Sequence, residues 1–149
     1  MKKLILVCSL LVAMASIGFG QRETAAEAAK EFASAKWLKV GADAQGFPIS
    51  INTSDIQRIN GIVGFRTKYE KRGTTVYGAY FGNCTTDKLL ESPLGWATYA
   101  GSSKLVSVSI EFSAEQDANG LMTVVPQTIG WNLLDYACEH PTSVKVFQQ

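Results

Sequence analysis

The residues that could do chemistry in this chain are few and widely spaced. The sequence of 149 residues holds one histidine and three cysteines. Cys138 and His140 lie two residues apart, which suits a dyad in which the imidazole deprotonates the thiol. A cysteine held in a disulfide is not a nucleophile, however, and His140 would then serve only as a cation at the negative end of a helix dipole. We expect this second arrangement.

Carboxylates are another source of chemistry. Asp135 and Glu139 are four residues apart, which places them on one face of a helix and would suit general acid–base work. The same spacing describes a solvated helix face, and we expect that arrangement here. A single histidine and two bridged cysteines do not supply the usual zinc ligands, and no nucleophile-elbow, phosphate-loop or dinucleotide motif is present. The sequence therefore predicts no catalytic residues, no metal site and no cofactor.

Cations and aromatic residues offer contacts rather than catalysis. Four cations gather in one short stretch: Arg66, Lys68, Lys71 and Arg72. We expect them to surround a solvated hairpin tip, and contact with a polyanion is the alternative. Three aromatic residues could line a ligand surface: Trp96, Tyr99 and Tyr80. Aromatic residues of a small β-rich domain more often belong to its core.

The first twenty residues have the pattern of a cleavable signal peptide. The chain begins with Met1-Lys2-Lys3, continues with an apolar run from Leu4 to Ala15, and then has the small residues Gly18 and Gly20. This order of a positive, an apolar and a small-residue region predicts cleavage before Gln21, with a cut after Ala15 as the alternative. A membrane anchor is the competing interpretation, but an apolar stretch of about 16 residues is short against the ~20 that cross a bilayer.

Cleavage changes both the charge and the number of cysteines. It removes two lysines and no acidic residue, so the formal net charge goes from +1 to −1. A near-neutral chain has no electrostatic footprint for nucleic acid. Cleavage also removes Cys8 and leaves Cys84 and Cys138, an even number that suits an oxidising compartment. We expect a structural disulfide between them that closes a loop of about 55 residues, and a redox-active pair is the alternative.

The remaining chain divides into a leader and one body. Residues 21–36 are rich in Ala, Glu and Lys, which predicts a frayed helix or a flexible leader. Residues 37–149 form a single domain that begins as antiparallel β-structure. Asn60-Gly61 lies between alternating stretches and predicts a hairpin. Six stretches have the composition or alternation of strands: Trp37–Val40, Asp55–Ile59, Ile62–Tyr69, Thr74–Phe81, Leu105–Phe112 and Leu121–Val125.

The periodicity changes after Pro126. Thr128 is a suitable N-cap for a helix from Ile129 to about Glu139, and Pro141 ends it. Polar residues of this helix fall in one narrow stripe, and apolar residues cover the rest of its surface. Such a helix must be mostly buried, and we expect it to pack on the sheet.

The order of these features resembles a known family. The features are the strand that begins at Trp37, the segment Ile51–Ile56, the Asn60-Gly61 hairpin, Asn83-Cys84, and the Pro-led helix within Val125–Cys138. Over roughly residues 37–140 the chain resembles the surface-adhesin protein E-like domain of bacterial exported proteins. The resemblance implies an antiparallel sheet with a C-terminal helix tethered by a disulfide, with Cys84 and Cys138 at the family's cysteine positions. The adhesin that names the family binds host matrix and serum proteins.

Together these observations predict an α+β domain, an antiparallel β-sheet of five to seven strands with a C-terminal helix docked on it and tied by one disulfide. We expect an exported protein, periplasmic or secreted, that acts as a non-enzymatic binding or adhesin-like module of the bacterial envelope. Its partner would be an extracellular or envelope protein, with no nucleic acid and no membrane span after cleavage. An enzyme that uses carboxylates and tyrosines in a pocket is the alternative.

Overall fold

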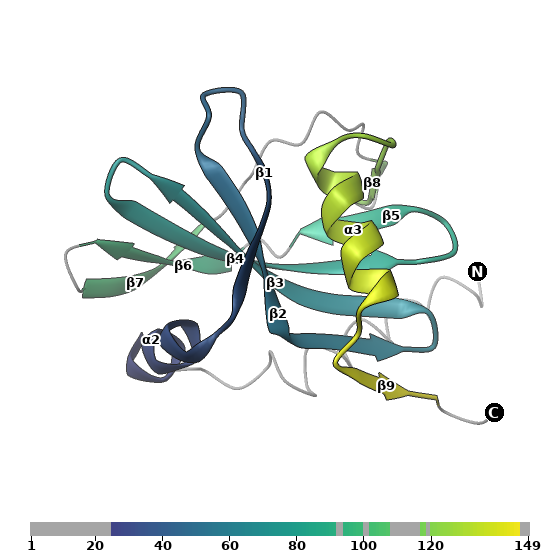
Figure 1. The fold of residues 1–149 in the computed structure, drawn as a ribbon, viewed down its shortest axis with the longest axis horizontal. Coiled ribbons are helices and arrows are strands. Elements are labelled where there is room, and N and C mark those ends of the chain that lie inside the picture. The colour runs from purple at the N-terminus through teal and green to yellow at the C-terminus, as the bar shows by residue number, and fades with distance from the viewer. Residues whose placement is uncertain (1–24, 92–93, 100–101, 108–116, 119, 147–149) are drawn as a thin grey trace.

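The fold is an antiparallel sheet with a helix packed on it, as the sequence predicts (Figure 1). The computed structural model describes residues 25–91, 94–99, 102–107, 117–118 and 120–146. The expected signal peptide, residues 1–20, lies outside the described residues. Two helices are described, α2 (Ala25–Ser34) and α3 (Ile129–Glu139).

The described strands form one curled sheet. They are β1 (Trp37–Ala42), β2 (Pro48–Ile59), β3 (Ile62–Lys71), β4 (Thr74–Asn83), β5 (Lys88–Glu91), β6 (Leu94–Tyr99), β7 (Ser102–Ser107), β8 (Met122–Thr123) and β9 (Ser143–Lys145). The order β1-β2-β3-β4-β5-β8 makes the main path, while β6 pairs with β4 and carries β7. The strand pairs of the main path and those of β6 are antiparallel. Of the described strands, β9 alone runs parallel to its neighbour, β2. The seven strands β1–β7 fit the expected number, and two short strands are added to them.

Two tight turns set the register of the central strands. Asn60 and Gly61 have φ values of 49° and 82°, and Arg72 and Gly73 have 49° and 79°. Positive φ at both central residues gives a turn whose twist matches that of the strands it joins. The Asn60-Gly61 prediction is confirmed, and both turns position β3 between β2 and β4.

Helix α3 has the bounds that the sequence predicts. The Thr128 side chain accepts a hydrogen bond from the backbone N–H of Trp131 at 3.2 Å, which satisfies one of the free donors of the first turn. His140 is the C-cap residue, and its backbone N–H donates to the Tyr136 carbonyl. Helix α3 packs against β1, β2 and β3. In Figure 1 it lies over the right-hand part of the sheet, whereas the β1–β2, β3–β4 and β6–β7 hairpins fan out on the other side.

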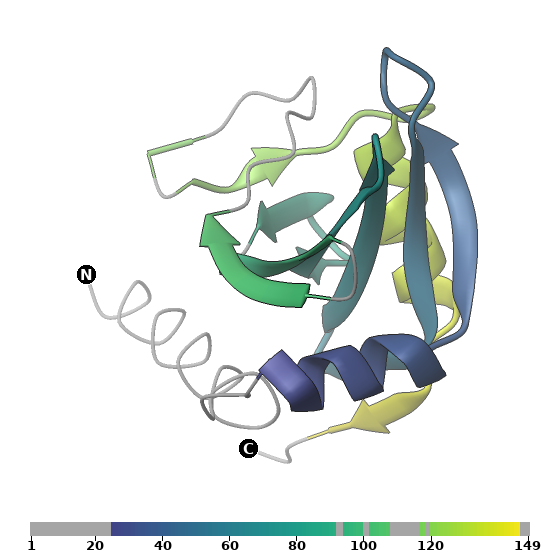
Figure 2. The ribbon, with the colours of Figure 1, turned by 90° about the vertical axis from the view of Figure 1, so that its left-hand side faces the viewer.

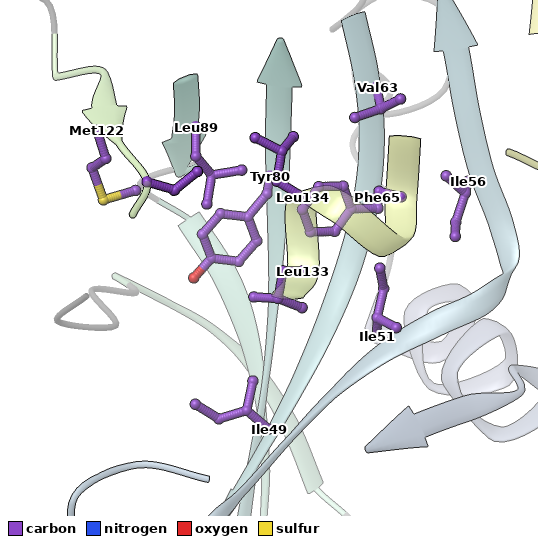
Figure 3. Close-up of a cluster of buried hydrophobic side chains, with 12 residues drawn as sticks. Ile49, Ile51, Ile56, Val63, Phe65, Tyr80, Leu89, Met122, Leu133 and Leu134 are labelled. Carbon is purple, nitrogen blue, oxygen red and sulfur yellow. The ribbon is translucent and has the colours of Figure 1, made fainter. Parts of the chain in front are cut away.

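The main core lies between α3 and one face of the sheet (Figure 3). Tyr80 and Phe65 are directly opposite each other on β4 and β3, both fully buried, with ring centroids 5.7 Å apart. Leu133 and Leu134 reach this layer from α3. Burying one such side chain contributes about 1.5–3 kcal/mol, so this layer supplies much of the stability of the fold.

The disulfide between Cys84 and Cys138 is present, as predicted. It joins the residue after β4 to the last turn of α3, with a Cα–Cα distance of 5.7 Å. The end of α3 is held by further contacts to β2. Arg58 donates to the Cys138 carbonyl at 3.2 Å, and the Thr142 backbone N–H donates to the Ile56 carbonyl at 2.8 Å.

Some predicted strands differ from the observed ones. The stretch Leu105–Phe112 is described only in its first part, within β7, and residues 108–116 lie outside the described residues. The stretch Leu121–Val125 contains only the short strand β8. The stretch Asp55–Ile59 is the end of a strand of 12 residues, β2, whose register with β3 shifts between Ile51 and Ile56.

Candidate binding surface

The second face of the sheet, opposite α3, carries cations beside aromatic rings. Lys68 on β3 is directly opposite Tyr77 on β4. Each lies three residues from a core residue of the same strand, Phe65 and Tyr80. Because successive side chains of a strand point to opposite faces, Lys68 and Tyr77 face away from α3. Arg66 shares their face because it lies two residues before Lys68.

Trp37 of β1 completes this group. Its ring lies 5.6 Å from the Tyr77 ring, and the Lys68 ammonium stands over it at 5.5 Å. A cation over an aromatic face at this distance is attracted by about 0.5–1 kcal/mol at an exposed site and more where water is excluded. We call Trp37, Arg66, Lys68 and Tyr77 the cation–aromatic face.

Helix α2 lies against the cation–aromatic face. The Phe32 ring stacks on the Tyr77 ring with centroids 3.8 Å apart and planes 10° apart. The Glu31 carboxylate forms an ion pair with Arg66 at 3.0 Å, and the Arg66 guanidinium also stands 5.5 Å from the Phe32 ring centre. Burial raises the pKa of Tyr77, with a further contribution from the charge of Glu70. Figure 2 shows α2 lying across the lower end of the strands beside β1.

The four clustered cations therefore do not form one hairpin tip. Arg66 lies in the middle of β3 and is only 8% exposed. Lys68 contacts Trp37 and forms an ion pair with Glu70 at 3.2 Å. Arg72 alone lies in the β3–β4 turn and is exposed, and Lys71 precedes it at the end of β3. The expected solvated tip is correct for Arg72, whereas Lys71 is half-buried and Arg66 and Lys68 belong to the sheet face.

The tips of the β1–β2 and β3–β4 hairpins are tied together. Tyr69 donates a hydrogen bond to the Asp43 carboxylate at 2.5 Å, and the Lys71 ammonium stands 5.4 Å from the Phe47 ring centre. The same carboxylate accepts hydrogen bonds from the backbone N–H groups of Gln45 and Phe47, both at 2.9 Å. This network fixes the turn of one hairpin against the strand of the other.

Tyr80 belongs to the core rather than to an accessible site. Its hydroxyl donates to the Glu91 carboxylate at 2.5 Å, and its residue surface is fully buried. Burial, together with the charge of Glu91, raises the pKa of Tyr80, so the phenol keeps its proton. Trp96 and Tyr99 lie on β6, where the backbone of Trp96 is directly opposite Tyr77, and their side chains are outside what the structure describes.

The residues near the end of α3 lie in the disulfide, at the helix C-cap and on the exposed side of the helix. Cys138 is in the disulfide, and the His140 imidazole lies 3.9 Å from the Glu139 carboxylate and 4.5 Å from the Tyr136 ring. Asp135 and Glu139 are both exposed on the outer side of the helix. Among the described residues, no group of three metal-ligating side chains lies close enough to hold an ion.

Comparison with protein-family models, curated proteins and solved structures found no match. Within the described part of the chain, no helix has both the length and the apolar character needed to cross a membrane.

The sequence did not lead us to predict the cation–aromatic face, although part of its pattern was present. The alternation of β4 already placed Tyr77 on the face opposite Tyr80. With two-residue turns at both ends of β3, the register would have set Lys68 beside Tyr77. The role of α2 gave a weaker signal, because Phe32 is the only large apolar residue in a segment of Ala, Glu and Lys.

Proposed function

We propose that this protein is an exported, non-enzymatic binding module of the bacterial envelope, periplasmic or secreted, comparable to surface-adhesin protein E-like domains. Its partner is an extracellular or envelope protein. The proposal combines the resemblance in the sequence with the surface chemistry of the sheet.

The observation that carries the proposal is the contact between cations and aromatic rings on the cation–aromatic face. Trp37 and Tyr77 lie 5.6 Å apart, with Lys68 above the Trp37 ring. Tryptophan, tyrosine and arginine are enriched where protein partners bind, because each gives a large contact area and a directed polar group. A face of this composition suits protein recognition better than it suits reaction chemistry.

The Cys84–Cys138 disulfide supports the export part of the proposal. Disulfides persist in the periplasm and outside the cell, and they are rare in a reducing cytoplasm. The bridge between β4 and α3 would therefore remain closed in the compartment where the protein acts.

Site-specific photo-crosslinking in the native host would test this function. Lys39 is exposed on β1, opposite Ser50, which is in turn opposite Lys68, so the three residues form one row on the cation–aromatic face. A photoreactive residue at Lys39 should give a defined protein adduct in the periplasmic or extracellular fraction. The same residue at Asp135, on the exposed side of α3, is the matched control.

Adducts at Lys39 but not at Asp135 would support the proposal. Equal labelling at both positions, or a protein found only in the cytoplasmic fraction, would contradict it. We place the photoreactive residue at Lys39 rather than at a buried residue of the cation–aromatic face. The Lys39 side chain is exposed, so its replacement keeps the fold intact.

A further inference from the structure

Helix α2 occupies the cation–aromatic face through groups that a ligand would also use. Phe32 presents a flat ring to Tyr77 at 3.8 Å, and Glu31 presents a carboxylate to Arg66 at 3.0 Å. The Phe32 carbonyl accepts a hydrogen bond from the Trp37 indole N–H at 3.2 Å. A ring, an anion and a backbone acceptor from one short segment thus satisfy three members of the face.

The helix is joined to the sheet by a short and clearly bounded hinge. It ends at Ser34, and β1 begins at Trp37. Lys36 already belongs to the sheet, because its carbonyl accepts from the Thr53 backbone N–H at 2.7 Å and its own N–H donates to the Ser54 hydroxyl at 2.9 Å. Opening of α2 about Ala35 would therefore leave β1 and β2 paired.

Helix α2 is held by its packing against the cation–aromatic face and by its contacts with β7. Of its residues whose burial is described, only Ala28 and Phe32 are buried. A helix of ten residues is below the length at which isolated helices persist in water, so its order depends on those contacts. Segments with few buried contacts open at a lower free energy than the whole domain unfolds. Opening of α2 would uncover Tyr77 and Arg66.

We propose that the cation–aromatic face binds a helical segment of a partner protein that presents a carboxylate next to an aromatic ring, and that α2 occupies this site as an intramolecular competitor. This inference rests on the proposed function and names the chemistry of its partner. The buried Arg66 sets the requirement for an anion, and the Tyr77 ring, on which Phe32 stacks, sets the requirement for a flat ring. A partner must displace α2 before it binds, so the helix sets the threshold for binding.

The test uses full-length protein and a labelled peptide that copies residues 22–36 of this chain. In the Phe32→Ala variant, α2 loses its stacking on Tyr77 and the site opens. We expect the peptide to bind this variant saturably. Its affinity for the wild type should be lower by a factor on the order of ten or more, because a ligand's apparent affinity falls with the fraction of open molecules. A peptide that carries both Glu31→Gln and Phe32→Ala is the matched control and should not bind.

A second opened variant guards against misfolding. Glu31→Arg places a like charge beside Arg66 and leaves the apolar residues of α2 unchanged, so it should also bind the peptide. Circular dichroism and melting curves establish that both variants keep the sheet.

If the peptide binds neither folded variant, the proposal is wrong. If the wild type instead forms dimers by exchanging α2, the occupant is a second copy and the partner proposal is overturned. Adducts at Lys39 without peptide binding would leave the proposed function standing and remove only this inference. Peptide binding without adducts would show that the face accepts a helix, but it would contradict the proposed function and with it the partner.

Discussion

The Asp43 carboxylate accepts three hydrogen bonds at the β1–β2 turn, and one of them comes from another hairpin. The hydrogen bond from Tyr69 is the main reason that the pKa of Asp43 is lowered, and backbone N–H groups of Phe47 and Gln45 contribute further. The same hydrogen bond, together with burial, raises the pKa of Tyr69 to about 12. The two residues thus favour an ionised carboxylate beside a protonated phenol.

This pair makes stability depend on pH at both ends of the scale. The folded pKa of Asp43 is lowered, so its contribution is present above the unfolded pKa of about 4 and is lost as the pH falls through the folded value. The folded pKa of Tyr69 is raised, so its contribution is present below the unfolded pKa of about 10 and is lost as the pH rises toward 12. We expect Tyr69→Phe to lower the free energy of unfolding near neutral pH, and the difference from wild type to shrink below pH ~4 and above pH ~10.

Denaturant unfolding across the pH range measures this difference. Asp43→Asn is the matched variant, and it should bring the pKa of Tyr69 back toward its ordinary value. Ultraviolet absorbance follows the titration of Tyr69, with Tyr69→Phe as the reference. A titration unchanged by Asp43→Asn would show that burial rather than the hydrogen bond sets the pKa.

At the scale of elements, a side chain of α3 approaches the backbone of β4 closely at Gly82. A methyl group at Gly82 would lie 2.2 Å from Leu134 Cδ1 and 3.3 Å from Val63 Cγ2. The absence of a side chain at Gly82 therefore lets the Leu134 side chain pack directly on the strand. Leu134 fills the space above the glycine and is only 2% exposed.

A double-mutant cycle tests this contact. We expect Gly82→Ala to lower stability by about 1–3 kcal/mol through overpacking, and Leu134→Ala to lower it by about 2–5 kcal/mol through a cavity. In the double variant the new methyl group occupies part of the cavity, so the combined loss should be smaller than the sum of the two. Thermal or denaturant unfolding measures all three variants. Additive losses would mean that α3 does not pack on Gly82 as described.

The helix α3 could be predicted from the sequence because its ends carry local signals. Thr128 caps the first turn, Pro141 prevents continuation, and the apolar surface between them requires burial. Strand β2 could not be predicted in full, since Asn52–Asp55 have the polar composition that is typical of a loop although they lie within the strand. In the structure, contacts outside the β3 ladder hold part of this stretch, including the hydrogen bond from the Thr53 backbone N–H to Lys36. The parallel pairing of β9 gave no signal, because its residues are exposed and its hydrogen bonds are to the backbone.

The candidate surface was harder to predict than the fold. It depends on the placement of α2, which is far from β3 and β4 in sequence although it directly precedes β1. Only the meeting of Phe32 with Tyr77 and of Glu31 with Arg66 shows that the two are complementary. No local pattern at either segment indicates the other.

At the scale of the whole molecule, one covalent link joins the meander of β1–β4 to the C-terminal helix. Cys84 and Cys138 are 54 residues apart in sequence. In the chain-entropy model, closing a loop of this length raises the free energy of the unfolded chain by about 4 kcal/mol. We expect the double variant Cys84→Ser, Cys138→Ser to unfold at a clearly lower denaturant concentration. A redox-active bridge would instead reduce easily and leave stability nearly unchanged on removal. Thiol titration of the purified wild type in a glutathione buffer separates these outcomes.

The same bridge decides how the protein would behave after proteolysis. Cys84 and Cys138 close a covalent ring, within which β5, β6, β7, β8 and nearly all of α3 are enclosed. One backbone cut inside the ring leaves a single connected molecule, whose mass is unchanged apart from one water until the bridge is reduced. A cut between α2 and β1, by contrast, lies outside the ring and leaves α2 with no covalent attachment to the sheet. One cut by a protease would therefore leave the helix held on the cation–aromatic face by non-covalent contacts alone, while the pieces cut within the ring would remain tethered in place.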